Sequence, residues 1–385
     1  MLKKNFPIVL FISIYVICYF FPYIFSNFFF HPDLLSDRNL SIVLDFYNKA
    51  FITSILGLIF FILGYFSYLK YFSNNKEYNK FIIYMKVDTL FLYFFISLIF
   101  FIFFSFIDFF SEFKLVFYDL IFIFSIIIFY SFHKNILIKL LFFFIVLLFL
   151  LLDVATSNTA PFVKHSIQLL LIMSFLDKLN WKIIYIFLII TLFFFLAKAD
   201  LRVLTVLDIS FFERIFSVYT YIDQETFKYV AMRINQLFIL ALSIDFHYFG
   251  DSEVYFNHFF GSLIPRIFWF NKPLNDIGQN FGHDLYLIGT YDYVTSVNVP
   301  LISQIIIAFG LGGLIFIFFI IGMIFSYISS KKNNIENLIS KTIFFSYFVF
   351  IIENSSYSLF GSILKYIFCF LFFYFIHSLL IKKIK

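Results

Sequence analysis

Long apolar runs constrain the fold of this chain more than any other feature. The 385-residue sequence is rich in Phe, Ile and Leu, and short polar segments divide it into apolar stretches. A helix of about 20 apolar residues spans a lipid bilayer. The sequence therefore predicts an all-α polytopic membrane protein with about ten transmembrane helices, at 6–30, 50–69, 89–107, 117–132, 138–153, 160–176, 183–199, 301–329, 342–353 and 360–381.

Composition excludes the soluble classes of protein. Only 13% of the residues are charged, whereas a soluble domain carries about 25% charged residues. The net charge of +5 does not indicate a nucleic-acid partner, because the lysines cluster at the ends of the apolar runs. Cys18 and Cys369 both lie inside apolar runs, so they predict neither a disulfide framework nor a metal site.

The distribution of basic residues predicts the orientation in the membrane. Cytoplasmic loops of membrane proteins carry an excess of Lys and Arg. With the N-terminus in the cytoplasm, the inside segments hold 16 basic residues and the short outside loops hold four, Arg38, Lys49, Lys114 and Lys164. We therefore expect both termini in the cytoplasm and the long segment after the seventh run on the outer face of the cytoplasmic membrane.

Residues 198–300 form the one long segment that is too polar to be buried in a membrane. This segment holds 11 of the 23 acidic residues, and its patterning predicts helices at 200–221 and 225–246. The second of these has an apolar face, which is typical of a helix at the membrane interface. The chain thus divides into an N-terminal transmembrane bundle (1–199), a large outer-face loop (200–300) and C-terminal transmembrane helices (301–385).

The most distinctive run in this loop is Ile264-Pro265-Arg266-Ile267-Phe268-Trp269-Phe270-Asn271-Lys272-Pro273. Its two prolines fix the backbone and remove two donors, so the run is rigid. Arg266 can bind a phosphate through two parallel hydrogen bonds, and Lys272 adds a compact positive charge. The run predicts a clamp for a phosphate-containing lipid headgroup. An interfacial anchor is equally compatible, with Trp269 among the headgroups and the cations extended to water.

Two further arginines are candidates for substrate contact. Arg202 follows the seventh apolar run, and Arg233 lies inside the second predicted loop helix. An arginine near a membrane usually faces a cavity or a partner. The loop holds 11 acidic residues against seven basic ones, so phosphate recognition depends on individually placed arginines. The alternative for each is an ion pair with a loop carboxylate such as Asp200 or Glu225.

Candidate bases gather around Gly282-His283-Asp284. A hydroxyl nucleophile benefits from a positioned base, and histidine titrates near neutrality. A surface or hydrogen-bonding role for His283 is the alternative, and the other candidate acceptors are Asp251, Glu253, His258 and Asp276. Inside the apolar runs, the polar residues His165, Gln168 and Asn354 either line a cavity or satisfy one another and the backbone.

From Gly250 to Gly313 the sequence resembles the Wzy-type polysaccharide polymerases, which extend O-antigen or capsule repeat units. That family often ends a long outer-face loop with an IPR-x-x-W-x-x-KP-like run, here residues 264–273, followed by a glycine-rich helix start, here residues 309–313. The motifs cover about 65 residues, and the remainder matches in topology. This chain departs from the family by having Phe270-Asn271 where Pro-Asp is commoner.

The resemblance implies an enzyme of the bacterial inner membrane that moves a growing glycan from undecaprenyl pyrophosphate onto another lipid-linked repeat unit. No cofactor, metal or nucleic acid is implied. The implied partners are the undecaprenyl-pyrophosphate-linked oligosaccharides, membrane lipid and a chain-length regulator protein. Arg266 and Lys272 carry over from the motif, and Arg202 carries over more loosely. Arg202 and Arg266 would hold the pyrophosphate, while His283 or Asp284 would activate the acceptor hydroxyl.

Two rival functions share part of this pattern. An O-antigen ligase has a similar loop, but its histidine motif lies near the following span, and His283 lies about 27 residues before Gly310. A flippase for lipid-linked oligosaccharides would be expected to have about twelve or more spans and no outer loop of this length. The sequence favours the polymerase and keeps these two as alternatives.

Overall fold

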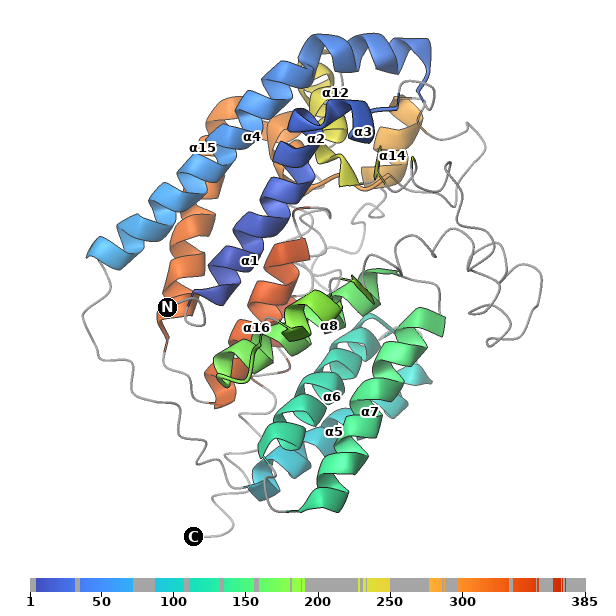
Figure 1. Cartoon of the computed structure of the whole chain (residues 1–385), viewed down its shortest axis with the longest axis vertical. Coiled ribbons are helices and arrows are strands. Elements are labelled where there is room, and N and C mark those ends of the chain that lie inside the picture. Colours follow the sequence, from blue (N-terminus) through green and yellow to red (C-terminus); the bar gives the residue numbers. More distant parts are fainter. Residues whose placement is uncertain are drawn as a thin grey trace, which may run out of the picture.

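The structure is a computed structural model that describes residues 5–31, 35–71, 87–106, 111–131, 135–155, 159–180, 182–187, 189–190, 228, 231–232, 234–249, 277–285, 287, 297–331, 335–350, 352, 363–367, 369 and 371. Every regular element in these ranges is a helix (Figure 1). The elements are α1 (Phe6–Tyr15), the π-helical turn η1 (Val16–Phe20), α2 (Phe21–Ile24), α3 (Ser26–Phe29), α4 (Asp37–Tyr71), α5 (Val87–Ser105), α6 (Ser111–Ser131), α7 (Ile136–Ala155), α8 (Thr159–Phe175), α12 (Gln236–Phe249), α14 (Ile277–Asp284), α15 (Leu301–Ser330) and α16 (Ile335–Phe350).

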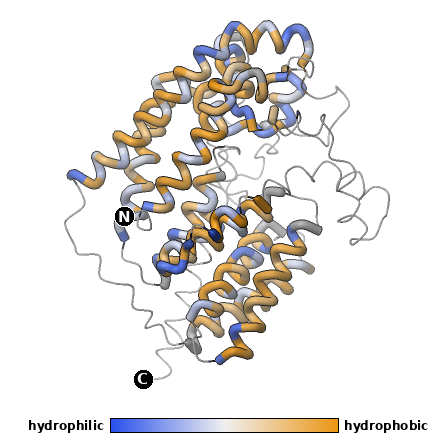
Figure 2. The backbone as a smooth tube through the Cα atoms, viewed as in Figure 1, coloured by the Kyte–Doolittle hydropathy of each residue, from blue (hydrophilic) through white to orange (hydrophobic). Residues whose placement is uncertain are grey.

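Within the described residues, five helical stretches are long and apolar enough to cross a membrane. They are Phe6–Ile24, Asp37–Tyr71, Phe113–Ser131, Ile136–Asp153 and Leu301–Ser330, and two shorter apolar helices accompany them at Leu90–Ser105 and Pro161–Phe175. Large apolar side chains on these helices remain exposed, as along α7, where Ile136, Leu137 and Phe144 point away from the bundle. Figure 2 shows the apolar character of these helices along their lengths. The chain is therefore a helical membrane protein, and the total of ten spans stays a prediction.

The closest helix packing joins α4 to the part of α15 that follows a break at Gly310. These two run parallel (Figure 1), because Gly57 lies beside Phe318 and, further along both helices, Tyr68 lies beside Tyr327. A Cβ atom at Gly64 would overlap the backbone carbonyl of Phe319, and one at Gly322 would overlap that of Phe61. Further along, the rings of Tyr68 and Tyr327 lie 5.8 Å apart. Small residues that let backbones approach closely are the usual basis of helix association in membranes, where lipid chains remove the hydrophobic driving force.

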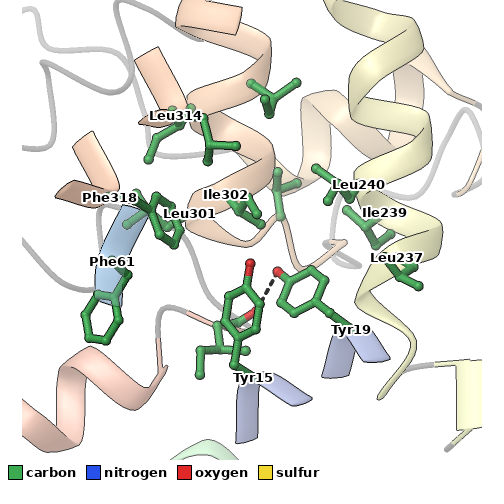
Figure 3. Close-up of a cluster of buried hydrophobic side chains, with 14 of the residues drawn as sticks. Tyr15, Tyr19, Phe61, Leu237, Ile239, Leu240, Leu301, Ile302, Leu314 and Phe318 are labelled. Carbon is green, nitrogen blue, oxygen red and sulfur yellow. Dashed lines mark hydrogen bonds between the residues drawn. The ribbon is translucent and has the colours of Figure 1, made fainter. Parts of the chain in front are cut away.

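A first apolar core forms where α1 packs antiparallel to α4 and against α15. The Tyr15 hydroxyl donates to the carbonyl of Ser54 at 2.8 Å, and the Tyr19 hydroxyl donates to the carbonyl of Ile352 at 3.3 Å. Both rings are buried and lie 4.6 Å apart. Figure 3 shows them beneath Leu301 and Ile302 at the start of α15. Because each phenol finds a backbone acceptor, these tyrosines can be buried without an unmet donor.

A second apolar core joins α5, α6, α7, α8 and α16. α5 and α6 are antiparallel, with Phe100 stacked on Phe117 at 5.3 Å. α6 and α7 are also antiparallel, because the start of α6 contacts the end of α7 at Tyr118 and Phe149, 4.5 Å apart. The phenylalanines of this core interlock in stacked, tilted and edge-on pairs, and offset-stacked and edge-on arrangements are the favoured geometries for aromatic rings.

The directions of the helices alternate along the chain. Lys341 at the start of α16 donates to the carbonyl of Lys331 just after α15, at 2.6 Å, so these two helices are antiparallel. α8 is antiparallel to α16, since Lys164 lies near Tyr347 while Phe175 lies near Lys341. It follows that α8 starts at the same end of the bundle as α4 and as the part of α15 that follows Gly310.

Several helix boundaries differ from the sequence prediction. α4 begins at Asp37 rather than at residue 50. Its first turns carry polar side chains that bond to other parts of the chain, as Asn39 does to the carbonyl of Leu285. The four basic residues assigned to outside loops all lie on helices: Arg38 and Lys49 on α4, Lys114 on α6 and Lys164 on α8. In the predicted 225–246 helix, the helix is interrupted at Asn235 and α12 continues to Phe249.

Candidate functional site

The structure describes two of the seven residues that the sequence predicted as site residues. His283 and Asp284 lie in the last turn of α14. The other predictions lie outside the described residues, and they are Arg202, Arg233, Arg266, Trp269 and Lys272. The predicted clamp therefore remains a prediction from the sequence.

Helix α14 is fastened to the bundle at the end where α4 starts. The side-chain amide of Asn39 donates to the carbonyl of Leu285 at 2.8 Å, and the backbone N–H of Val297 donates to the carbonyl of Gly278 at 3.1 Å. Phe281 is fully buried and lies 6.0 Å from Phe246 of α12. These contacts hold a part of the predicted outer-face segment against the transmembrane helices.

His283 and Asp284 do not form a pair that acts on one point. Consecutive residues of a helix project about 100° apart, and here His283 is half-buried while Asp284 is exposed. Asp284 thus lies on the exposed side of α14, whereas His283 lies partly on its packed side. The exposed carboxylate is thus the better placed of the two for contact with an external hydroxyl.

The structure reveals a second polar site that lies inside the second apolar core. Four ionisable side chains meet there from three consecutive helices: Asp119 of α6, Asp153 of α7, and Lys164 and His165 of α8. The side chains of Asp119 and His165 are fully buried, while that of Lys164 is 16% exposed. Ionisable groups inside membrane spans are costly to bury, and they mark functional sites more often than chance would suggest. We refer to these four residues as the charge cluster.

Asp119 is the acceptor at the centre of the charge cluster. The Lys164 ammonium lies 2.7 Å from Oδ1 and 2.8 Å from Oδ2 of Asp119. The Tyr347 hydroxyl of α16 donates to Oδ2 at 3.1 Å, and the Tyr366 hydroxyl donates to the same oxygen. A buried carboxylate is stabilised only when hydrogen bonds satisfy its lone pairs, and Asp119 meets that condition with donors from three segments.

His165 connects the two carboxylates of the charge cluster. Its Nε2 lies 3.0 Å from Oδ1 of Asp119, and its Nδ1 lies 2.5 Å from Oδ2 of Asp153. The imidazole is enclosed by aromatic rings, with the ring of Phe122 4.4 Å away. Asp153 also accepts a hydrogen bond from the Tyr118 hydroxyl at 3.4 Å. The histidine is therefore fixed at both ring nitrogens and cannot rotate without breaking a contact.

The charge cluster lies toward the same end of the bundle as α14. Asp153 is two residues from the end of α7, and His165 is six residues from the start of α8. Since α8 starts at the end where α4 starts, the cluster lies below that face and not at the middle of the spans. Within the described residues, no group of three or more His, Cys, Asp or Glu side chains is arranged to hold a metal ion.

The sequence reasoning found one member of the charge cluster and missed its acids. His165 was expected either to line a cavity or to be satisfied by neighbours, and the structure has it bonded to two carboxylates. Gln168 likewise donates to Ser346 of α16 at 3.4 Å. The missed signal was a lone acid within each of two apolar runs, Asp119 and Asp153, with Lys164-His165 in the next run.

Comparison with family models, with curated proteins and with solved structures finds no match for this chain.

Proposed function

We propose that this protein is a polymerase that joins undecaprenyl-pyrophosphate-linked oligosaccharide repeat units into O-antigen or capsular polysaccharide. The motif at residues 264–273 and the glycine-rich stretch at 309–313 support the proposal, because both resemble the Wzy-type pattern. The reaction is a metal-independent glycosyl transfer at the outer face of the bacterial cytoplasmic membrane.

The observation that carries the proposal furthest is the attachment of α14 to the membrane helices. An enzyme that acts on a lipid-linked glycan needs polar catalytic groups close to the end of a bundle, where the lipid headgroup lies. The hydrogen bond from Asn39 to Leu285 holds α14, and hence Asp284, next to the start of α4. The motif run 264–273 precedes α14 by only a few residues in the sequence.

The proposed mechanism assigns roles to the residues of this segment. Arg202 and Arg266 hold the donor pyrophosphate and stabilise the charge that develops on it as it leaves. Arg233, Lys272 and Trp269 contribute to substrate binding, through charge and through aromatic stacking on the sugar or headgroup. A base removes the proton of the acceptor hydroxyl as that oxygen attacks the sugar. The exposure of Asp284 favours it over His283 for this role.

The proposed topology has ten spans and both termini in the cytoplasm. Helix direction supports this arrangement, since α4, α6, α8 and α15 share one direction while α1, α7 and α16 run the opposite way. These are the directions expected for spans two, four, six and eight against spans one, five and nine. Because α8 and α15 run in the same direction, the chain between them must cross the membrane an odd number of times. The seventh apolar run supplies one such crossing.

Gene deletion followed by gel analysis of surface polysaccharide tests the proposal. Loss of the polymerase should abolish the long-chain ladder and leave a single repeat unit attached to its lipid. Re-expression of the wild-type chain should restore the ladder, and Asp284→Asn should restore less of it than the matched neighbour His283→Gln. Retention of a normal ladder in the deletion strain would exclude the proposal.

The charge cluster supports one alternative, a transporter that moves the lipid-linked repeat unit across the membrane. Ionisable residues within spans often belong to ion or substrate pathways. The same deletion separates the two functions, because loss of a flippase removes every surface repeat unit, including the single one. The loop motif favours the polymerase.

A further inference from the structure

We infer that Asp119, His165 and Asp153 form an intramembrane proton-binding site, whose bound proton holds the end of α7 against α8. The inference rests on the charge cluster alone and is independent of the proposed glycosyl transfer. Its ligand is the proton.

The proton follows from the hydrogen-bond count around the imidazole. Both ring nitrogens of His165 face carboxylate oxygens, at 3.0 Å and 2.5 Å. An ionised carboxylate only accepts, and a neutral imidazole has a single N–H to donate. Two contacts of this length therefore need one more proton than a neutral histidine between two carboxylates provides. That proton resides either on the ring, as imidazolium, or on one carboxyl group that donates to the ring.

The charge balance of the cluster leads to the same conclusion. With the additional proton, the net charge of the four residues is zero, because the Lys164 ammonium and the added proton balance the charges of the two carboxylates. Without it, the cluster carries one uncompensated negative charge among aromatic rings. A buried unpaired charge is strongly unfavourable, so the packed arrangement favours the protonated form.

The contact that opens on deprotonation is the one between His165 and Asp153. Asp119 is held by Lys164, Tyr347 and Tyr366 in addition to the histidine, so it retains the remaining N–H. Asp153 accepts a longer hydrogen bond from the Tyr118 hydroxyl, at 3.4 Å. Loss of the proton leaves a lone pair on Nδ1 of His165 facing a lone pair on Oδ2 of Asp153 at 2.5 Å. Their repulsion separates the end of α7 from α8.

The groups that face the site come from every element packed around it. They are Tyr118 and Asp119 of α6, Asp153 of α7, Lys164 of α8, Tyr347 of α16 and Tyr366 of the following helical segment. Lys164, Tyr118 and Tyr347 are each partly exposed.

Substitution of Asp153 by Asn provides a sharp test of the proton count. An asparagine amide N–H can donate to a bare Nδ1, while the Nε2–H donates to Asp119. The variant thus keeps both contacts with a neutral histidine and needs no additional proton. Asp153→Asn should fold, and its cluster should bind one proton fewer than the wild type.

The measurement is nitrogen NMR of ¹⁵N-histidine-labelled protein in lipid nanodiscs at pH 7, with His165→Gln identifying the signal. It is paired with infrared spectroscopy of carboxyl groups. The wild type should show either two protonated nitrogens at His165 or a protonated carboxyl band, and Asp153→Asn should show neither. A wild-type His165 with one bare nitrogen and no protonated carboxyl band would overturn the inference, as would a protonated carboxyl band of equal intensity in both proteins when the wild-type histidine has one bare nitrogen.

A second measurement tests the coupling to helix packing. Spin labels at Leu115 of α6 and Leu152 of α7 would report displacement of the end of α7, because the pair of Asp119 with Lys164 ties α6 to α8. Cys18→Ser and Cys369→Ala first remove the native thiols. Both leucines are exposed. Raising the pH should lengthen or broaden the distance in the wild type and leave it unchanged in Asp153→Asn. Labels at Ile99 and Leu115, on α5 and α6, are the control pair. A wild-type distance that does not respond to pH while the NMR signal titrates would refute the coupling.

Discussion

The imidazole of His247 donates a hydrogen bond from Nδ1 to the carbonyl of Ile307 at 2.9 Å. This carbonyl is available because α15 is broken at Gly310, whose backbone angles of φ 64° and ψ −163° are not helical. A helix break frees a carbonyl that would otherwise accept a hydrogen bond from the backbone N–H four residues later in the chain. The side chain of His247 on α12 thus satisfies the carbonyl that the break in α15 leaves free. Because a carbonyl only accepts, Nδ1 of His247 carries a proton.

The first prediction concerns Gly310. Only glycine adopts these backbone angles readily, and a Cβ there would meet Nε2 of His247 at 3.0 Å. Gly310→Ala should therefore destabilise the protein by about 1–3 kcal/mol. Gly312→Ala is the matched control, because nothing lies within 4 Å of its added Cβ. Thermal unfolding in detergent measures both, and equal midpoints for the two variants would contradict the assigned strain.

The second prediction concerns the crossing of α4 and α15. An alanine at Gly322 would overlap the backbone carbonyl of Phe61, which cannot move aside as a flexible side chain can. Overpacking of this kind costs typically about 1–3 kcal/mol. Gly322→Ala should lower the unfolding temperature more than Gly57→Ala, where the nearest atom is the movable Tyr15 hydroxyl at 3.2 Å. The reverse order would mean that the close approach is not maintained in the membrane.

The third prediction concerns Asp119 as the centre of the charge cluster. Asp119→Asn removes the anion that faces Lys164 and His165, so it leaves buried positive charge without its partner. Breaking a buried pair in this way costs about 3–5 kcal/mol. The double variant Asp119→Asn with Lys164→Met should recover part of that loss. Denaturant unfolding of the purified protein measures the three free energies, and a double variant less stable than Asp119→Asn alone would contradict the pairing.

The sequence predicted the class of fold because lipid restricts the possibilities. Backbone polar groups in hydrocarbon must be satisfied within a segment, so a run of apolar residues such as 138–153 can only be a helix. Its boundaries came within two residues of α7. The start of α4 was missed because residues 37–49 carry polar side chains, whose partners come from distant parts of the chain, as Leu285 does for Asn39.

The charge cluster could be predicted only in part because its contacts are tertiary. His165 is visible as a polar residue within an apolar run, but its two partners lie 46 and 12 residues away along the chain. Nothing in local periodicity selects Asp119 over another acid as its neighbour. Opposite charges at matching depth in different spans, such as Asp119 and Lys164, are the signal that a sequence offers once the direction of each span is assigned.

The fourth prediction concerns orientation. The excess of lysine and arginine in alternate loops predicts that the segment before α15 faces outward and that the end of α15 faces the cytoplasm. A reporter enzyme fused near residue 255 should therefore be active only outside, and one fused near residue 335 only inside. A cytoplasmic result for the fusion near 255 would place α14 and the motif run on the wrong side for the proposed reaction.

The last prediction concerns Arg266, for which the sequence supports both a phosphate clamp and an interfacial anchor. Lysine keeps the charge but lacks the planar fork of arginine, so Arg266→Lys distinguishes the two. An anchor tolerates lysine, because both side chains extend to the headgroups. A clamp loses its paired hydrogen bonds to pyrophosphate. Loss of such a contact costs about 3 kcal/mol in the transition state, or roughly 100-fold in rate.

We therefore expect Arg266→Lys and Arg266→Ala to shorten or abolish the polymer while the amount of protein in the membrane stays near normal. Surface-polysaccharide gels and immunoblots of membranes measure the two quantities side by side. A loss of protein that parallels the loss of polymer would indicate that Arg266 is a structural ion-pair partner. Wild-type chain length with Arg266→Lys would favour the anchor, and wild-type length with Arg266→Ala would remove Arg266 from the mechanism.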